Sequence, residues 1–429
     1  LALLMLVGVP VRAQDVRTLT LAEVVDRART AATPVQAAGL DVRDRAASVA
    51  AARAAYLPEV SAYASGAQRY GLAFDQTAGR LTQAATQAMS VGTEVSYPLF
   101  DGFTRAAALA RSRADLAGAE LTATHARQQA TADALRAAYT LAADESAVAL
   151  AEAQVEAARR QAALVEAQID AGRRPATERL QAAERVAAAE LAVLEARRVQ
   201  QRSTLALVRL LALDPATRYR FEPPTPDSSA FISDEAIAAL VGEALSRRAD
   251  LRALDAATEA AAAQQRAVRA GTLPTVAVVG GYGTSFTSTG EGAFGSQLGQ
   301  NRGGSLGLRV GMPLLNQRRT RAEAAAAEAR TARARLDVED RRREIETEVR
   351  GALADGQVLV QTLDVAHRRV AAAALAVEAE TARYNAGTTT LADLAEVQAR
   401  YAQAVATRDR ARLDLAFQHT LLAFLTGTL

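Results

Sequence analysis

Three pairs of landmark residues recur along this chain at one nearly constant offset. Each returns 215 or 216 residues later: Leu57-Pro58 as Leu273-Pro274, Pro98-Leu99 as Pro313-Leu314, and Ala171-Gly172 as Ala386-Gly387. An offset of that size is far longer than the unit of a solenoid repeat. The sequence therefore predicts a tandem duplication, with a first repeat at 14–213, a Pro-rich linker at 214–233 and a second repeat at 234–429.

The composition favours long helices over a bulky globular core. Half of the 429 residues are hydrophobic, yet there is no Trp and only 4% of the residues are aromatic. Apolar content supplied mainly by Ala and Leu suits helices that pack at close range. The 50 basic and 48 acidic residues are interspersed, so the sequence has no electrostatic footprint for nucleic acid and we expect no such partner.

Residues 1–13 have the pattern of the later part of a signal peptide. An apolar run too short to span a bilayer is followed by Val11-Arg12-Ala13, with small or apolar residues at the positions that a signal peptidase reads. Cleavage after Ala13 would leave Gln14 first, with no Cys to carry a lipid anchor. Since no later stretch is apolar enough for a transmembrane helix, we expect any membrane contact to be made by strands.

Each repeat changes from helical to strand periodicity at its Leu-Pro landmark. Helical patterns at about 20–31 and 35–56 precede two expected strands at about 58–70 and 91–99, joined by a loop at about 71–90. The second repeat shows strands at about 275–286 and 305–315, joined by a loop at about 287–303. Apolar residues alternate there with Gly, Ser and a single Arg, which suits a strand with lipid outside and water inside. A soluble sheet with one solvated face shows the same alternation.

Long Pro-free stretches follow each strand pair. Residues 103–170 and 315–385 contain no Pro, and a helix of that length would extend roughly 100 Å at 1.5 Å per residue. Each stretch ends at a Gly that can close a helix in the left-handed conformation, and a second helical stretch begins at once, at about 176–213 and 391–425. The sequence predicts two helical hairpins with tight tips. An exposed coiled-coil scaffold would explain these helices but not the strands.

Two segments resemble a known family. Arg383-Tyr384-Asn385-Ala386-Gly387, followed by Leu391-Ala392-Asp393-Leu394, resembles the hairpin signature of TolC-like outer-membrane efflux channels. Tyr97-Pro98-Leu99-Phe100-Asp101-Gly102-Phe103 is similar to the strand-to-helix junction of the same family. The resemblance extends in order from about Leu19 to Leu425, and the first repeat carries a weaker copy of the hairpin signature.

The resemblance implies a fold that combines helices with transmembrane strands. Each chain would give a β-hairpin and a long helical hairpin per repeat, and a homotrimer would form a 12-strand barrel continued by an α-helical periplasmic tunnel. Closure has an independent physical reason, because four strands leave two open edges that hydrocarbon does not tolerate. Two copies would give eight strands and a filled interior, whereas three give twelve strands and a conduit.

The implied function is that of an outer-membrane exit duct in a tripartite efflux or type I secretion system. Such a duct conducts passively and contacts outer-membrane lipid, a periplasmic adaptor (membrane fusion) protein and an inner-membrane transporter of the RND or ABC type. Two cargo classes fit it, small toxic compounds and a secreted polypeptide. The alternative from another class is a periplasmic coiled-coil scaffold without channel activity.

The resemblance places the pore gate and selectivity residues at the hairpin tips. The matching residues are Asp393, Glu396, Tyr384 and Glu178. Asp393 and Glu396 are three residues apart and therefore share a helix face. Carboxylates crowded into a constriction attract cations, so we expect a cation-selective gate.

The same tips are expected to dock the adaptor. The docking residues are Gly172, Arg173 and Arg174 in the first repeat and Gly387, Thr388 and Thr389 in the second. In the family, an acid at the position of Glu178 pairs with an Arg two residues after the second Gly, which is Thr389 here. Arg173 and Arg174 are the substitute donors. An exposed pair would contribute at most about 1 kcal/mol, so several links must break together in a robust gate.

The sequence gives no indication of an enzyme. It contains no Lys, no Cys and none of the common hydrolase or metalloprotease motifs. His125, His367 and His419 lie on separate helical stretches without the spacing of a metal site. We therefore expect no cofactor and no metal.

Overall fold

The computed structural model describes residues 16–75, 79–222, 234–288, 292–314 and 317–428. The expected signal peptide, the end of the linker and the expected helix start at Leu315 lie outside these residues. The chain divides into two compact units. One, here called the helical unit, comprises residues up to Leu40, Leu121–Leu251 and Asp340–Leu429; the other, the strand unit, comprises Asp41–Glu120 and Arg252–Glu339.

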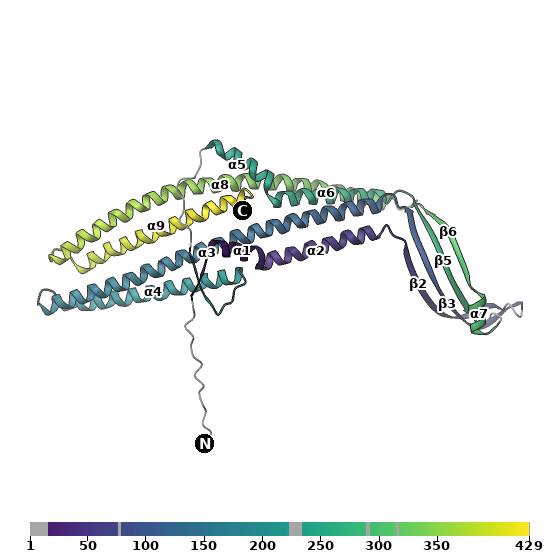
Figure 1. Ribbon diagram of the computed structural model, residues 1–429, viewed down its shortest axis with the longest axis horizontal. Coiled ribbons are helices and arrows are strands. Elements are labelled where there is room, and N and C mark those ends of the chain that lie inside the picture. The colour runs from purple at the N-terminus through teal and green to yellow at the C-terminus, as the bar shows by residue number, and fades with distance from the viewer. Residues whose placement is uncertain (1–15, 76–78, 223–233, 289–291, 315–316, 429) are drawn as a thin grey trace, which may run out of the picture. The chain divides into compact units, whose positions relative to one another are not determined.

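Two helical hairpins dominate the helical unit. The first joins the later part of α3 (Thr104–Asp170) to α4 (Thr177–Leu210), and the second joins the later part of α8 (Gln317–Asn385) to α9 (Leu391–Leu425). Within each pair the two helices run side by side (Figure 1). The unit also holds β1 (Val16–Leu19), α1 (Leu21–Ala31), β4 (Arg218–Phe221) and α5 (Asp234–Arg247).

A two-stranded parallel sheet lies where a linker was predicted. β4 falls inside the expected linker 214–233 and pairs with β1, a strand that the sequence analysis did not predict. Its four residues alternate charge with aromatic ring, and Tyr219 and Phe221 are buried together with Leu19 at the centre of the helical unit's core. The alternation is present in the sequence, but the adjacent prolines led to the prediction of a linker instead of a strand.

A buried network of charges fixes α8 to the junction between α5 and α6 (Ala249–Ala270). Arg248, whose side chain is 4% exposed, pairs with Asp250 at 2.7 Å and with Glu348 at 2.5 Å. Arg341 on α8 binds the same Asp250 at 2.9 Å. Burial raises the pKa of Asp250, but the two guanidinium groups outweigh it and lower that pKa to about 2.

The strand unit contains one antiparallel sheet. Its strands are β2 (Glu59–Asp75), β3 (Arg80–Phe100), β5 (Thr275–Thr287) and β6 (Gly303–Gly311), in the order β2-β3-β5-β6. The unit also holds most of α2 (Thr33–Ala54) and the early parts of α3 and α8. β2 and β6 each leave one edge of the sheet without a strand partner among the described residues of this chain.

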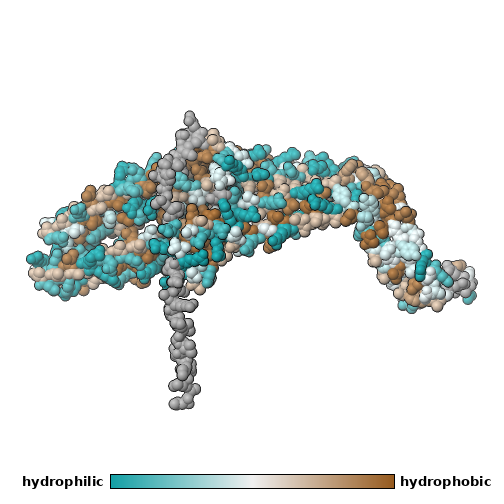
Figure 2. All heavy atoms as spheres, viewed as in Figure 1, coloured by the Kyte–Doolittle hydropathy of each residue, from teal (hydrophilic) through white to brown (hydrophobic). Residues whose placement is uncertain are grey.

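The two faces of the sheet differ in chemistry. The register aligns Val95, Gly280 and Leu306 in one row, and Glu94, Gly281 and Ser305 in the next row on the opposite face. The apolar face is open to solvent in the single chain, since Leu306, Leu308 and Val310 are 84%, 63% and 65% exposed. In Figure 2 hydrophobic and neutral residues cover most of the strands, whereas hydrophilic residues are frequent on the helices. The alternation predicted from sequence is therefore present.

The two expected loops are smaller than predicted. β2 continues to Asp75 and β3 begins at Arg80, so most of 71–90 is strand. These strand ends were not predicted because they contain many Thr, Gln and Ala residues and lack a clear apolar alternation. Backbone pairing itself needs no large apolar side chain. The loop at 287–303 contains a short helix, α7 (Phe294–Gln300), and the Gln297 side chain bonds both backbone groups of Thr287.

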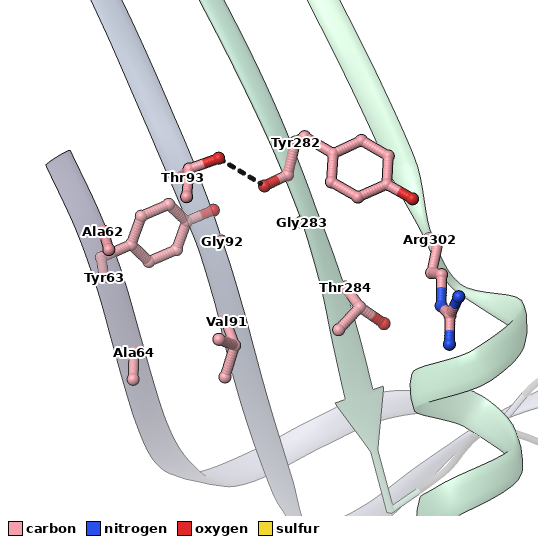
Figure 3. Close-up of a pocket in the computed structure, with 10 residues that line it drawn as sticks. All are labelled: Ala62, Tyr63, Ala64, Val91, Gly92, Thr93, Tyr282, Gly283, Thr284 and Arg302. Carbon is pink, nitrogen blue, oxygen red and sulfur yellow. Dashed lines mark hydrogen bonds between the residues drawn. The ribbon is translucent and has the colours of Figure 1, made fainter. Parts of the chain in front are cut away.

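Glycines let a tyrosine lie across the sheet. A Cβ on Gly92 would come within 3.0 Å of the Tyr63 hydroxyl and 2.9 Å of the Tyr282 carbonyl. Figure 3 shows the Tyr63 ring directed from β2 toward Gly92, and the Thr93 hydroxyl bonded to the Tyr282 carbonyl. The missing side chains leave a hollow of about 540 Å³ beside these residues.

The junction between β3 and α3 uses two consecutive left-handed residues. Gly102 and Phe103 have φ of 69° and 68°, and a Cβ on Gly102 would lie 2.7 Å from the Ala270 carbonyl oxygen. Asp101 caps the first turn of α3, because its carboxylate accepts from the Arg105 backbone N–H at 2.8 Å. The described residues contain no helix with both the length and the apolarity needed to cross a bilayer.

Candidate functional site

The two hairpin tips close their long helices in the same way. Gly172 (φ 70°) and Gly387 (φ 78°) each adopt the left-handed conformation directly after the helix. In both tips the next N–H bonds a carbonyl five residues back: Arg173 bonds Gln168 at 2.8 Å, and Thr388 bonds Arg383 at 3.0 Å. This is the Schellman closure, which satisfies the last carbonyls of a helix and favours Gly at this position.

The second tip is fastened by three threonines. Thr388 donates to the Arg383 carbonyl, Thr389 donates to the Glu380 carboxylate at 2.5 Å, and Thr390 forms a capping box with Asp393 at the start of α9. The first tip has no such cap, since Ala176 precedes α4 without a side-chain hydrogen bond. The second tip is thus capped by its own threonines, whereas the first is held by the ion pairs of Arg174 with Glu178 and of Arg179 with Glu166.

A compact latch joins the first hairpin to the second. The Tyr384 hydroxyl on α8 donates to Glu178 on α4 at 3.1 Å, and Arg174 donates to the Tyr384 carbonyl at 2.7 Å. The Arg174 guanidinium also lies over the Tyr384 ring, 4.2 Å from its centroid, and pairs with Glu178 at 3.3 Å. Here "latch" denotes these three residues, Arg174, Glu178 and Tyr384.

Tyr384 is buried and its two charged partners are largely shielded from solvent, so the latch differs from a surface ion pair. Tyr384 is 1% exposed, and the side chains of Arg174 and Glu178 are 12% and 13% exposed. Removing one partner of a buried pair costs about 3–5 kcal/mol, because the other charge is left uncompensated. Burial, and then the charge of Glu178, raise the pKa of Tyr384, so its hydroxyl remains a donor at neutral pH.

An apolar cluster supports the latch from both hairpins. It joins Tyr384 to Val165, Ala182, Leu391 and Leu394. Next to it, Arg185 on α4 donates to the Leu391 carbonyl at 2.5 Å. Arg174 and Arg185 therefore bind backbone carbonyls of the second tip on both sides of its turn, at the end of α8 and at the start of α9.

The structure brings some of the expected gate residues together and leaves others apart. Tyr384 and Glu178 are in contact, and Arg174, one of the two expected substitute donors, pairs with Glu178. Asp393 is exposed, and one of its oxygens accepts from Thr390 and Thr389; these bonds, from Thr390 first, lower its pKa. Glu396 is 62% exposed and pairs with Arg400 one turn further along α9.

Sequence reasoning missed Arg185 and Glu380. Arg185 lies within α4, whereas Arg174 lies in the turn before that helix, so helical spacing does not relate the two residues. Glu380 precedes Tyr384 by one turn and is 9% exposed. Their partners are a backbone carbonyl and a threonine of the tip, and no pattern of charged residues indicates such contacts.

Comparison with known proteins supplies the wider context. The sequence profile of the family described as "Outer membrane efflux protein" matches residues 24–213 and again 240–428. Protein CyaE of Bordetella pertussis is 29% identical over 332 residues, which are 76% of this chain and 67% of CyaE.

Solved structures share the fold. The CmeC outer membrane channel of Campylobacter jejuni superposes with a TM-score of 0.81 at 17% identity, covering 95% of this chain and 85% of CmeC. The outer membrane protein VceC of Vibrio cholerae gives a TM-score of 0.80 at 18% identity, covering 95% of this chain and 96% of VceC.

Proposed function

Because the chain belongs to the outer membrane efflux protein family, we propose that it is a passive outer-membrane exit duct. It receives substrate from a periplasmic adaptor and an inner-membrane transporter of the RND or ABC type, in a tripartite efflux or type I secretion system. Members of this family are channels rather than enzymes. The residues of the duct hold, select and release substrate, and they make or break no covalent bond.

The sheet is the observation that carries this proposal. It has one exposed apolar face, one face of Gly, Ser and charged residues, and two edges without partners among the described strands. An apolar face of this extent suits lipid, and edges in hydrocarbon must be paired. Three copies pairing β6 of one with β2 of the next close a 12-strand barrel with the polar face inside.

The hairpin tips supply the periplasmic gate and the adaptor surface in this proposal. The latch keeps the two hairpins of one subunit together, and Asp393 and Glu396 of three subunits form an acidic ring. Gly172, Arg173, Gly387 and Thr388 are exposed at the tips and contact the adaptor. The two repeats, 14–213 and 234–429, each contribute one hairpin to this arrangement.

Membrane fractionation separates the duct from the alternative, a periplasmic coiled-coil scaffold. The protein should remain in the outer-membrane fraction after carbonate washing, enter solution only with detergent, and then have the mass of a trimer of 45.0 kDa chains. Release by salt or carbonate alone, or a monodisperse monomer in mild detergent, would contradict the duct.

A further inference from the structure

A cavity of about 510 Å³ lies between the two hairpins of the helical unit, just behind the latch. Pockets of about 300–1,000 Å³ are typical of small-molecule sites. Residues of α3, α4, α8 and α9 line this one, and most of them are alanines. These alanines include Ala157, Ala162, Ala188, Ala395 and Ala399.

Arg185 is the cation among the residues that line this cavity, whose other polar side chains are those of Gln154, Gln161, Gln398 and Tyr401. Arg185 is half-buried, and its Nη2 donates to a neutral group, the Leu391 carbonyl. Within the described ranges it has no ion pair with a carboxylate. Burial lowers the pKa of Arg185, an effect that the neighbouring Glu184 partly opposes. A guanidinium has five N–H donors, so most of those of Arg185 remain available.

A second donor lies in the same cavity. Gln161 on α3 is one of the lining residues, and its buried Nε2 makes no hydrogen bond to any residue that the structure describes. The amide lies close to the Tyr384 hydroxyl and lowers that group's pKa against the larger effect of burial, but the geometry of the two groups does not make a hydrogen bond. A buried donor without an acceptor is costly, and a cavity that combines such a donor with a guanidinium whose donors are only partly used has the chemistry of an anion site.

We propose that this cavity binds a small amphipathic carboxylate of the benzoate class. The carboxylate accepts from the free N–H groups of Arg185 and from the Gln161 amide, and the flat apolar body lies against the alanine walls. A neutral ligand would leave the positive charge of Arg185 without a counter-charge. A simple anion would leave the apolar walls in contact with water. Charge complementarity therefore selects a carboxylate with a ring over either of them.

The position of the cavity gives the ligand an effect on the gate, a consequence that rests on the proposed function. The walls belong to both hairpins, and Arg185 links the site to Leu391 beside the latch. A ligand that needs both walls binds the closed tips more tightly than separated ones. By linkage it favours the closed state and should lower conductance.

Binding of 4-fluorobenzoate to the purified full-length protein in maltoside detergent, followed by ¹⁹F NMR, tests the site. The unmodified protein should bind it saturably and should bind 4-fluorobenzamide at least tenfold more weakly. Arg185→Ala should weaken benzoate binding at least tenfold, and Ala188→Leu, which fills the cavity from an exposed position, should do the same. Arg197→Ala is the matched control, because Arg197 lies on α4 outside the cavity and pairs with Glu152.

Several results would overturn the proposal. They are equal binding of the benzamide, equal binding of acetate, unchanged binding in Arg185→Ala, or no uptake because a second copy of the chain fills the cavity in the trimer. The benzamide comparison uses the unmodified protein and so does not depend on the folding of a variant. A protein that conducts in bilayers but binds no benzoate refutes this site alone, whereas one that binds benzoate but never conducts refutes the duct.

Discussion

Tyr384 combines two roles at the tips that are usually given to different residues. Its ring belongs to the apolar cluster with Leu391 and Leu394, while its hydroxyl and carbonyl bind Glu178 and Arg174. A change that deletes only the hydroxyl therefore separates the polar link from the packing. That separation makes this residue the most informative one to alter at the gate.

The acidic ring is a prediction at the same scale. Asp393→Asn with Glu396→Gln should reduce cation selectivity in planar bilayers and weaken block by multivalent cations from the periplasmic side, because the ring loses its charge. The amide introduced at position 393 keeps an acceptor for Thr390, so α9 remains capped. Since Arg400 pairs with Glu396, Arg400→Ala should strengthen selectivity.

Glu94 on β3 provides the control for the ring, because it carries the same charge on the polar face of the sheet. Glu94→Gln should change the block at the tips far less than the double substitution. If the double substitution leaves both block and selectivity unaltered, the two carboxylates are an ordinary solvated surface.

Glu145 on α3 predicts a dependence of stability on pH. Burial raises its pKa to about 7, and Arg220, 3.6 Å away on β4, offsets only part of that effect. The folded protein therefore holds a proton between about pH 4.5 and 7 that the unfolded chain releases. The unfolding free energy contributed by this group falls as pH rises through that window and is level above it.

Glu145→Gln should remove this contribution. The thermal midpoint of the Glu145→Gln variant, measured relative to that of the unmodified protein, should increase as the pH is raised from about 5 to about 8. Glu152→Gln, an exposed change on the same helix, should keep the unmodified slope. Parallel midpoints for Glu145→Gln and the unmodified protein across this range would show that the carboxyl titrates normally.

At the scale of elements, each tip depends on one glycine. Gly172 and Gly387 have open space around them, so only their positive φ restricts substitution. A β-branched side chain in this conformation costs roughly 1–2 kcal/mol, and the strain falls on the turn that is proposed to contact the adaptor. The sheet belongs to the other unit and should form normally.

Gly172→Val and Gly387→Val should therefore impair efflux while trimers still accumulate in the outer membrane. Gly351→Val is the matched control, since Gly351 lies within α8 with ordinary helical φ and nothing within 4 Å of an added Cβ. Undiminished efflux from both tip variants would count against docking through the tips.

The elements differ in how far the sequence alone could predict them. Pro-free runs ending at Ala-Gly predicted the long helices and their tips, because a run of that length without Pro has few alternatives to one continuous helix. β4 and α7 were missed, since one is a four-residue strand beside prolines and the other depends on contacts with β5. The residues of the latch were expected to be functional, but only the structure shows that Glu178 meets Tyr384, 206 residues away, and that Arg174 pairs with Glu178.

At the scale of the whole molecule, the sheet has two features that a single chain does not satisfy. Among the described strands β2 and β6 each have one unpaired edge, and the apolar face is exposed in the single chain. Completion by two further copies explains both features at once, as proposed for the duct. The latch then acts three times in each assembly, so its effect on opening should be cooperative.

Single-channel conductance of the latch variant tests the central claim most directly. The purified protein should insert into planar bilayers with low conductance, because the latch holds the tips closed. Arg174→Ala with Tyr384→Phe should give conductance steps several-fold larger, whereas Arg173→Ala, an exposed neighbour of the latch, should match the unmodified protein. If neither the unmodified protein nor the latch variant conducts after insertion, the chain is not a duct.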